Sequence, residues 1–145
     1  MIQYIDKNAS AIVESVITDK VLSHENKIII ETIVNVSNVI AVEERDFRTL
    51  ISDLLDNEID NCTKKCKDNT QHIKILINVF KCNLYINVNN ALGEGKGVRF
   101  RCYRMLLSGR ALVKSAIIKK YDGFICRYIK GNSLVVDILI PFPKL

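Results

Sequence analysis

The longest amphipathic segment of the chain, residues 46–65, constrains the fold most strongly. Its apolar residues recur every three or four positions, at Phe47, Leu50, Ile51, Leu54, Leu55, Ile59 and Cys62. This spacing predicts an α-helix with one apolar face, and Asp46 is the expected N-cap. Such a helix needs a second apolar surface to cover its stripe, so we expect the chain to fold as packed layers.

Helix and strand patterns also mark the rest of the chain. Apolar residues at helical spacing predict further helices at residues 9–23 and 111–121. Runs rich in β-branched residues predict strands at residues 27–36, 72–80, 84–89, 124–129 and 134–140. The order predicts a two-layer α/β sandwich, in which three helices cover one face of a mixed sheet of about five strands. We expect residues 1–145 to form a single domain.

The formal net charge is +5, and basic residues gather in and just after residues 90–108, a glycine-containing stretch without apolar periodicity. They are Lys96, Arg99, Arg101, Arg104 and Arg110. A stretch of this kind usually forms a solvated surface, but it can also contact the phosphates of a nucleotide or a nucleic acid. Nucleic-acid binding ranks last, because the stretch offers few aromatic rings for stacking beyond Phe100 and Tyr103.

The five cysteines are odd in number and irregular in spacing, which favours a reducing environment over a disulfide framework. Cys62 and Cys66 are one helical turn apart. A zinc site there is a remote alternative, because neither histidine, His24 or His72, lies nearby in sequence. We expect the cysteines to be small buried apolar residues.

The predicted helix at residues 46–65 also carries a row of oxygen-bearing side chains. Asp53, Asn57 and either Asp60 or Asn61 stand three or four positions apart, so they share a side of the helix beside the apolar stripe. Carboxylate and amide oxygens suit Mg²⁺, which keeps waters and phosphate oxygens in its coordination shell. The spacing fits two interpretations equally: the floor of a polar pocket, or an ordinary solvated helix face.

Residues 53–61, with the sequence DLLDNEIDN, resemble the N-box, the asparagine-containing helix segment of GHKL-superfamily ATPase domains. The resemblance is to the form NLLDNAIEA found in quorum-sensing histidine kinases of the accessory-gene-regulator (AgrC) type. Segments that follow the family's order and spacing are residues 11–22, 27–36, 84–90, 114–123 and 136–141. The resemblance therefore covers nearly the whole chain and implies the histidine-kinase, or Bergerat, ATPase fold.

The resemblance implies a site for ATP and Mg²⁺. Asn57 matches the asparagine that holds the metal against the triphosphate, and Asp53 stands where the family usually has another asparagine. These two are the expected catalytic residues. Residues 91–108 match the ATP lid. Further nucleotide contacts are implied for Asn61, for Asn89 and Asn90 near adenine, and for Gly109, Arg110 and Lys114 in the glycine box.

The glycine box, SGRALVKS at residues 108–115, departs from the family pattern GHGxGLKS. Ser108, Arg110 and Leu112 stand where glycines are expected, and their side chains obstruct a backbone that must approach phosphates closely. Glu58 replaces an alanine and adds negative charge beside a polyanion. We expect weak nucleotide binding, in which Arg110 and the basic lid supply positive charge.

The resemblance implies the ATP-binding catalytic domain of a two-component sensor histidine kinase, which transfers the γ-phosphate of ATP to a histidine outside this chain. Neither His24 nor His72 has the helical context of that acceptor, so both are expected at the surface. The implied partners are ATP, the dimerisation and phosphoacceptor helices of the parent kinase, and a response regulator. The alternative is a degenerate domain that binds no nucleotide and serves as a docking scaffold.

The N-terminal residues lack the basic-then-apolar pattern of a signal peptide. No apolar run reaches the ~20 residues that span a bilayer, so we expect no membrane contact from this segment. The resemblance implies that it is a cytoplasmic domain of a membrane-anchored parent protein.

Overall fold

The computed structural model describes residues 9–22, 28–36, 42–63, 71–91 and 116–142. Its elements are α1 (Ala9–Leu22), β1 (Ile28–Asn35), α2 (Glu44–Thr63), β2 (Gln71–Phe80), β3 (Asn83–Ala91), β4 (Phe124–Lys130) and β5 (Ser133–Pro141). Residues 116–120 are also helical. Within these ranges, no helix has both the length and the apolar character needed to cross a membrane.

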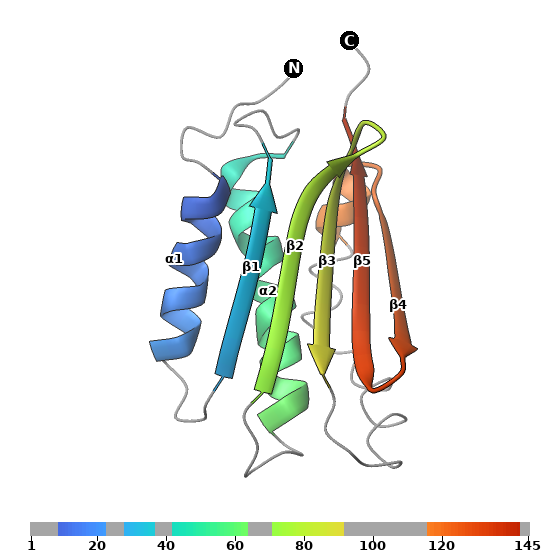
Figure 1. Ribbon diagram of the computed structural model, residues 1–145. Coiled ribbons are helices and arrows are strands. Elements are labelled where there is room, and N and C mark those ends of the chain that lie inside the picture. Colours follow the sequence, from blue (N-terminus) through green and yellow to red (C-terminus); the bar gives the residue numbers. More distant parts are fainter. Residues whose placement is uncertain (1–8, 23–27, 37–41, 64–70, 92–115, 143–145) are drawn as a thin grey trace.

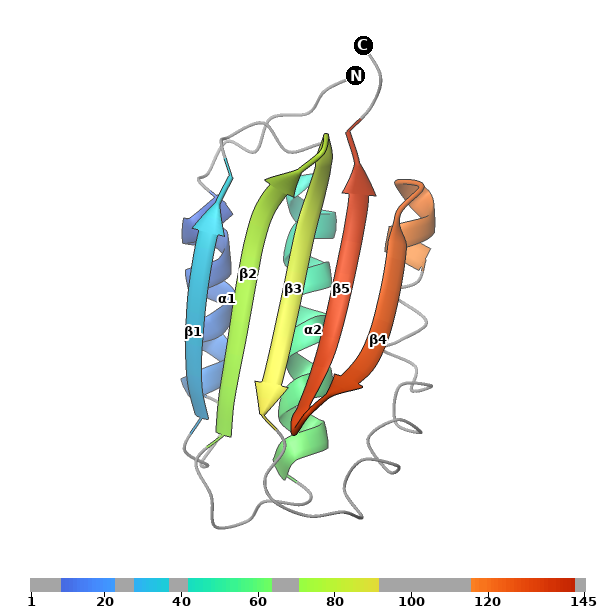
Figure 2. The same ribbon diagram turned by 45° about the vertical axis from the view of Figure 1, so that its right-hand side comes forward.

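The five strands form one mixed sheet in the order β1-β2-β3-β5-β4. β1 and β2 are parallel and are connected through α2, whereas the other neighbours are antiparallel. The helices lie together on one face of the sheet (Figures 1 and 2). The predicted two-layer sandwich is therefore confirmed.

The core lies between the sheet and the helices, because strands and helices alike present one apolar side. Along β3 the burial alternates, so that every second residue faces the helices. Fully buried core residues of α2 are Phe47, Leu50, Ile51, Leu54, Leu55 and Ile59, and those of the strands include Ile73, Ile77, Leu84, Ile86 and Ile138. The apolar stripe predicted for residues 46–65 thus packs as expected through Ile59, and the side chain of Cys62 lies outside the described residues.

Most element boundaries differ from the sequence-based prediction by one or two residues, including the start of α2 and the end of β3. α2 begins at Glu44, and the first helical hydrogen bond runs from the Phe47 amide to the Glu43 carbonyl, which makes Glu43 the N-cap in place of Asp46. β3 continues to Ala91, because its pairing with β5 runs on to Ser133.

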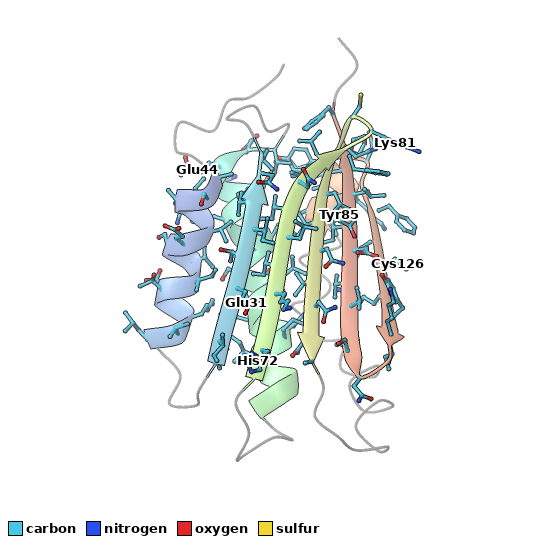
Figure 3. The ribbon with its side chains drawn as sticks, viewed as in Figure 1. Glu31, Glu44, His72, Lys81, Tyr85 and Cys126 are labelled. Atoms are coloured by element: carbon cyan, nitrogen blue, oxygen red, sulfur yellow. The ribbon has the colours of Figure 1, made fainter. Side chains whose placement is uncertain are left out.

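Three other residues with sequence-based predictions are exposed to solvent. His72 is exposed, as expected. Cys82 and Cys126 are free and exposed, so the expectation of buried cysteines is wrong for these two. Cys126 lies on the edge strand β4, where Figure 3 labels it, and Cys82 lies in the turn between β2 and β3. The side chains of the other three cysteines lie outside the described residues.

Candidate functional site

Three polar residues of α2, Asp53, Asn57 and Glu58, lie at or beside its buried side. Asn57 and Glu58 follow Leu54 by about one turn, and only 6% of Asn57 and 1% of Glu58 is exposed. Asp53, one turn before Asn57, is partly exposed. Asn57 therefore does not belong to a solvated helix face, and the Asp53–Asn57 side of α2 presents oxygens at the edge of the core.

Glu58 is held by Asn90 of β3, which is completely buried. Asn90 Nδ2 donates hydrogen bonds to Glu58 Oε2 at 2.9 Å and to the Glu58 carbonyl oxygen at 3.3 Å. A carboxylate so far from water requires such donors, since burying an uncompensated charge costs several kcal/mol, by an order-of-magnitude estimate. The contact joins α2 to the end of β3. It also gives a hydrogen-bond donor to the Glu58 carboxylate, the negative charge that distinguishes this segment from the N-box pattern.

Arg127 of β4 lies on the sheet side that faces the helices. The strand alternates, so Arg127 points the same way as Ile125 and Ile129. Burial lowers the pKa of the Arg127 guanidinium, while the negative charge of Glu58 acts in the opposite direction. The only sequence signal for this residue is an arginine at a position where the strand pattern calls for an apolar side chain.

The structure separates the two asparagines that were expected to lie near adenine. Asn90 points toward α2, whereas Asn89 lies on the opposite face of the sheet, because successive strand residues alternate. Asn61 belongs to α2, but its side chain lies outside the described residues. Gly109, Arg110 and Lys114, and the predicted lid after Ala91, also lie outside the described residues.

A polar cluster joins the N-terminus of α2 to the residues after helical residues 116–120. Lys120 Nζ lies 2.8 Å from Asp46 Oδ2, and the Tyr121 hydroxyl donates to the same oxygen. Burial pushes the pKa of Asp46 upward, but the hydrogen bonds from Lys120 and Tyr121 outweigh it and leave the pKa below its ordinary value. The cluster fixes where the chain re-enters the fold after the predicted lid.

A second polar cluster lies on the sheet face turned away from the helices (Figure 3, where Tyr85 is labelled). Asp137 accepts hydrogen bonds from Tyr85 at 2.7 Å, Asn87 at 2.7 Å and Tyr128 at 2.8 Å. Burial and the bond to Asp137 raise the pKa of Tyr85 to about 12. Strand alternation places Tyr85, Asn87 and Asp137 on the side opposite the buried core residues, so the cluster belongs to the architecture of the open face.

The Asp53–Asn57 pair has the donor chemistry that Mg²⁺ prefers. A carboxylate and an amide at positions i and i+4 lie on the same side of the helix, and Mg²⁺ completes its shell with water and phosphate oxygens. Within the described residues, no group of three or more His, Cys, Asp or Glu could hold a metal by itself. The pair could supply two oxygen ligands to a metal that completes its shell with water or phosphate oxygens.

Comparisons with known proteins identify the fold. No protein-family model and no curated protein sequence matches the chain. Among solved structures, the histidine kinase AdeS of Acinetobacter baumannii superposes with a TM-score of 0.69 at 18% identity, over 99% of this chain and 70% of that chain. The histidine kinase domain of a blue-light activated kinase from Erythrobacter litoralis gives 0.72 at 11% identity, over 97% and 68%.

The catalytic domain of the histidine kinase ThkA, in a nucleotide-free form, matches along nearly its full length. Its TM-score is 0.65 at 15% identity, and the match covers 96% of this chain and 95% of that domain. At these identities the likeness shows the fold, which is that of histidine kinase catalytic domains, and leaves the chemistry to the individual residues.

Proposed function

We propose that this chain is the ATP-binding catalytic domain of a sensor histidine kinase and that it presents the γ-phosphate of ATP to a histidine on another segment or chain. The observation that carries the proposal is the position of Asn57. It lies at the buried margin of α2, one turn after Asp53, in a fold shared with histidine kinase catalytic domains. Fold likeness alone would not assign the chemistry.

Each residue of the site has a role that follows from its chemistry. The Asn57 amide oxygen and the Asp53 carboxylate would hold Mg²⁺, which supplies charge neutralisation at the phosphates when bound. The bond from Asn90 to Glu58 fixes the next residue of α2 and with it the orientation of the helix beside the sheet. Phosphoryl transfer requires mostly positioning and electrostatic stabilisation, so a rigid helix margin of this kind suits it.

The finer assignments rest on the sequence resemblance. We propose that the parent protein is a membrane-anchored kinase of the AgrC quorum-sensing type, with this domain on the cytoplasmic side. Its partners would be the dimerisation and phosphoacceptor helices of the parent and a response regulator. Residues 53–61 support the subtype, and the altered glycine box at residues 108–115 supports weak nucleotide affinity.

Titration of Mg²⁺–ATP into the purified chain, followed by calorimetry, tests the proposal. We expect weak binding by the wild type and a further loss in Asn57→Ala, because alanine offers the metal no oxygen and leaves the site carboxylates facing the phosphates. Asn35→Ala is the matched control, since Asn35 is an exposed asparagine on β1. It should bind ATP as the wild type does.

A double variant probes the altered glycine box. Arg110→Gly with Leu112→Gly should tighten ATP binding if bare backbone can then approach the phosphates. It should weaken binding if Arg110 has become the phosphate contact. If neither the wild type nor the glycine variant binds at millimolar ATP, the kinase proposal fails and a nucleotide-free docking domain takes its place.

A further inference from the structure

Arg127 is a basic side chain on the helix-facing side of β4 that joins none of the ion pairs formed among the described residues. Lys20 pairs with Asp56 at 2.7 Å, Arg48 with Glu44 at 3.3 Å and Lys120 with Asp46 at 2.8 Å. In contrast, none of the ion pairs in the described part of the chain includes Arg127. Arg127 therefore interacts with the charge of Glu58 but forms no ion pair within the described residues.

The guanidinium of Arg127 also keeps unused hydrogen-bond donors away from solvent. Its Nε and one terminal nitrogen, Nη2, are buried and have no acceptor within the described ranges. Buried N–H groups without an acceptor are rare in folded proteins, and leaving one costs about 1–3 kcal/mol, more when the group is charged. A pair of such donors on one planar group therefore indicates an acceptor that is supplied by a ligand.

The surroundings of Arg127 define what that acceptor must be. Arg127 is on the side of the edge strand β4 that faces the helices, close enough to Glu58 for the two charges to interact. Glu58 is itself engaged by Asn90 and directly follows Asn57 in α2. A planar guanidinium with two free donors matches two oxygens of one carboxylate or phosphate group. Because the proposed function places ATP beside Asn57, the acceptor expected for Arg127 is a phosphate group of the nucleotide.

We propose that Arg127 is a further ligand-contacting residue, which donates two hydrogen bonds to a phosphate group of the bound nucleotide. This inference rests on the proposed function. The arginine also explains how the chain accommodates Glu58. The carboxylate next to Asn57 would repel a polyphosphate, and the guanidinium places a compensating positive charge between the two.

The test is a titration of ¹⁵N-labelled protein with Mg²⁺–ATP and, separately, with adenosine, followed by NMR chemical shifts. The method measures millimolar affinities, and the same spectra show whether a variant is folded. Arg127→Met should weaken ATP binding by about tenfold or more and leave adenosine binding unchanged. Arg127→Lys should keep part of the ATP affinity, because the charge remains but the planar pair of donors is lost.

Arg48→Met is the matched control, since Arg48 is an arginine on α2 whose ion pair with Glu44 is partly exposed. It should leave both affinities unchanged. Equal loss of ATP and adenosine binding in Arg127→Met, or no loss of either, would overturn the phosphate contact. If Arg127→Met does not fold, Arg127→Lys provides the test. Its affinity for ATP should fall relative to its affinity for adenosine, and an unchanged ratio would contradict the phosphate contact. Failure of the wild type to bind either ligand would instead reject the proposed function itself.

Discussion

The Tyr121 hydroxyl donates a hydrogen bond to the Asp46 carboxylate and accepts one from the Glu43 amide at 3.1 Å. One phenol oxygen thus joins the N-cap and the first turn of α2 to the chain that follows helical residues 116–120. Lys120 approaches the same carboxylate, so the joint is both hydrogen-bonded and charged. Because α2 carries Asn57, this joint sets how the proposed nucleotide helix sits against the C-terminal half of the fold.

Tyr121→Phe should lower the free energy of unfolding by about 1–2 kcal/mol, because a partly buried carboxylate loses one of its donors and the Glu43 amide loses its acceptor. Urea denaturation of Tyr121→Phe, Asp46→Asn and the double variant measures the coupling between the two residues. We expect the double variant to be less destabilised than the sum of the single variants. Strict additivity would show that the contact contributes nothing to stability.

Asp137 should make stability depend on pH in the acid range. Burial raises its pKa, but hydrogen bonds from Asn87, Tyr85 and Tyr128 outweigh this and hold the pKa below 3.8. A lowered pKa stabilises the fold fully above pH 3.8, and the contribution disappears as the pH falls through the lower, folded-state pKa.

The difference in unfolding free energy between wild type and Asp137→Asn should therefore be constant near neutral pH and shrink in acid. Chemical denaturation at a series of pH values measures it. Asp46 also has a lowered pKa, so the same series on Asp46→Asn separates the two carboxylates. A difference that does not vary with pH would mean that the three donors do not favour the ionised form of Asp137.

Tyr85 should resist ionisation in alkali. Burial and its bond to Asp137 raise its pKa from 10.0 to about 12. Since the neutral phenol is the favoured form in the fold, this stabilisation is complete below pH 10 and is lost as the pH rises through about 12. Absorbance titration of wild type against Tyr85→Phe isolates the phenol, and Asp137→Asn should move its pKa back toward 10.0.

Local periodicity accounts for much of the agreement between sequence and structure. Residues 46–65 repeat an apolar stripe over several turns, and the strands are marked by β-branched runs between turn residues. The Asp46 prediction was wrong because the capping pattern is local, whereas the partners of Asp46, Lys120 and Tyr121, come from far along the chain. Asp46 lies in the first turn of α2, where its carboxylate binds these distant donors and Glu43 caps the helix.

The site was less predictable, because its contacts cross between elements. Asparagine is a poor strand former, so the strand pattern ends near Asn89, but pairing with β5 carries β3 through Asn90. Once both residues are in the strand, they must face opposite sides. Neither the bond from Asn90 to Glu58 nor the approach of Arg127 to Glu58 has a signature in sequence spacing, because each joins residues of different elements.

Gly123, just before β4, and Gly131, in the turn between β4 and β5, should respond differently to substitution. A Cβ on Gly123 would lie 2.9 Å from the Leu139 carbonyl oxygen and 3.0 Å from a methyl carbon of Ile118. The carbonyl belongs to a paired strand and has little room to move, so Gly123→Ala should destabilise the fold by about 1–3 kcal/mol.

Gly131 has nothing within 4 Å of the added atom but adopts φ +61. Gly131→Ala should cost about 1 kcal/mol through backbone strain, and Gly131→Asn less, because asparagine tolerates the left-handed region. Thermal or urea unfolding of the three variants gives the order. If Gly131→Asn is no better than Gly131→Ala, backbone strain is not the cause at that turn, and if Gly123→Ala is neutral, the Leu139 strand yields more readily than its pairing implies.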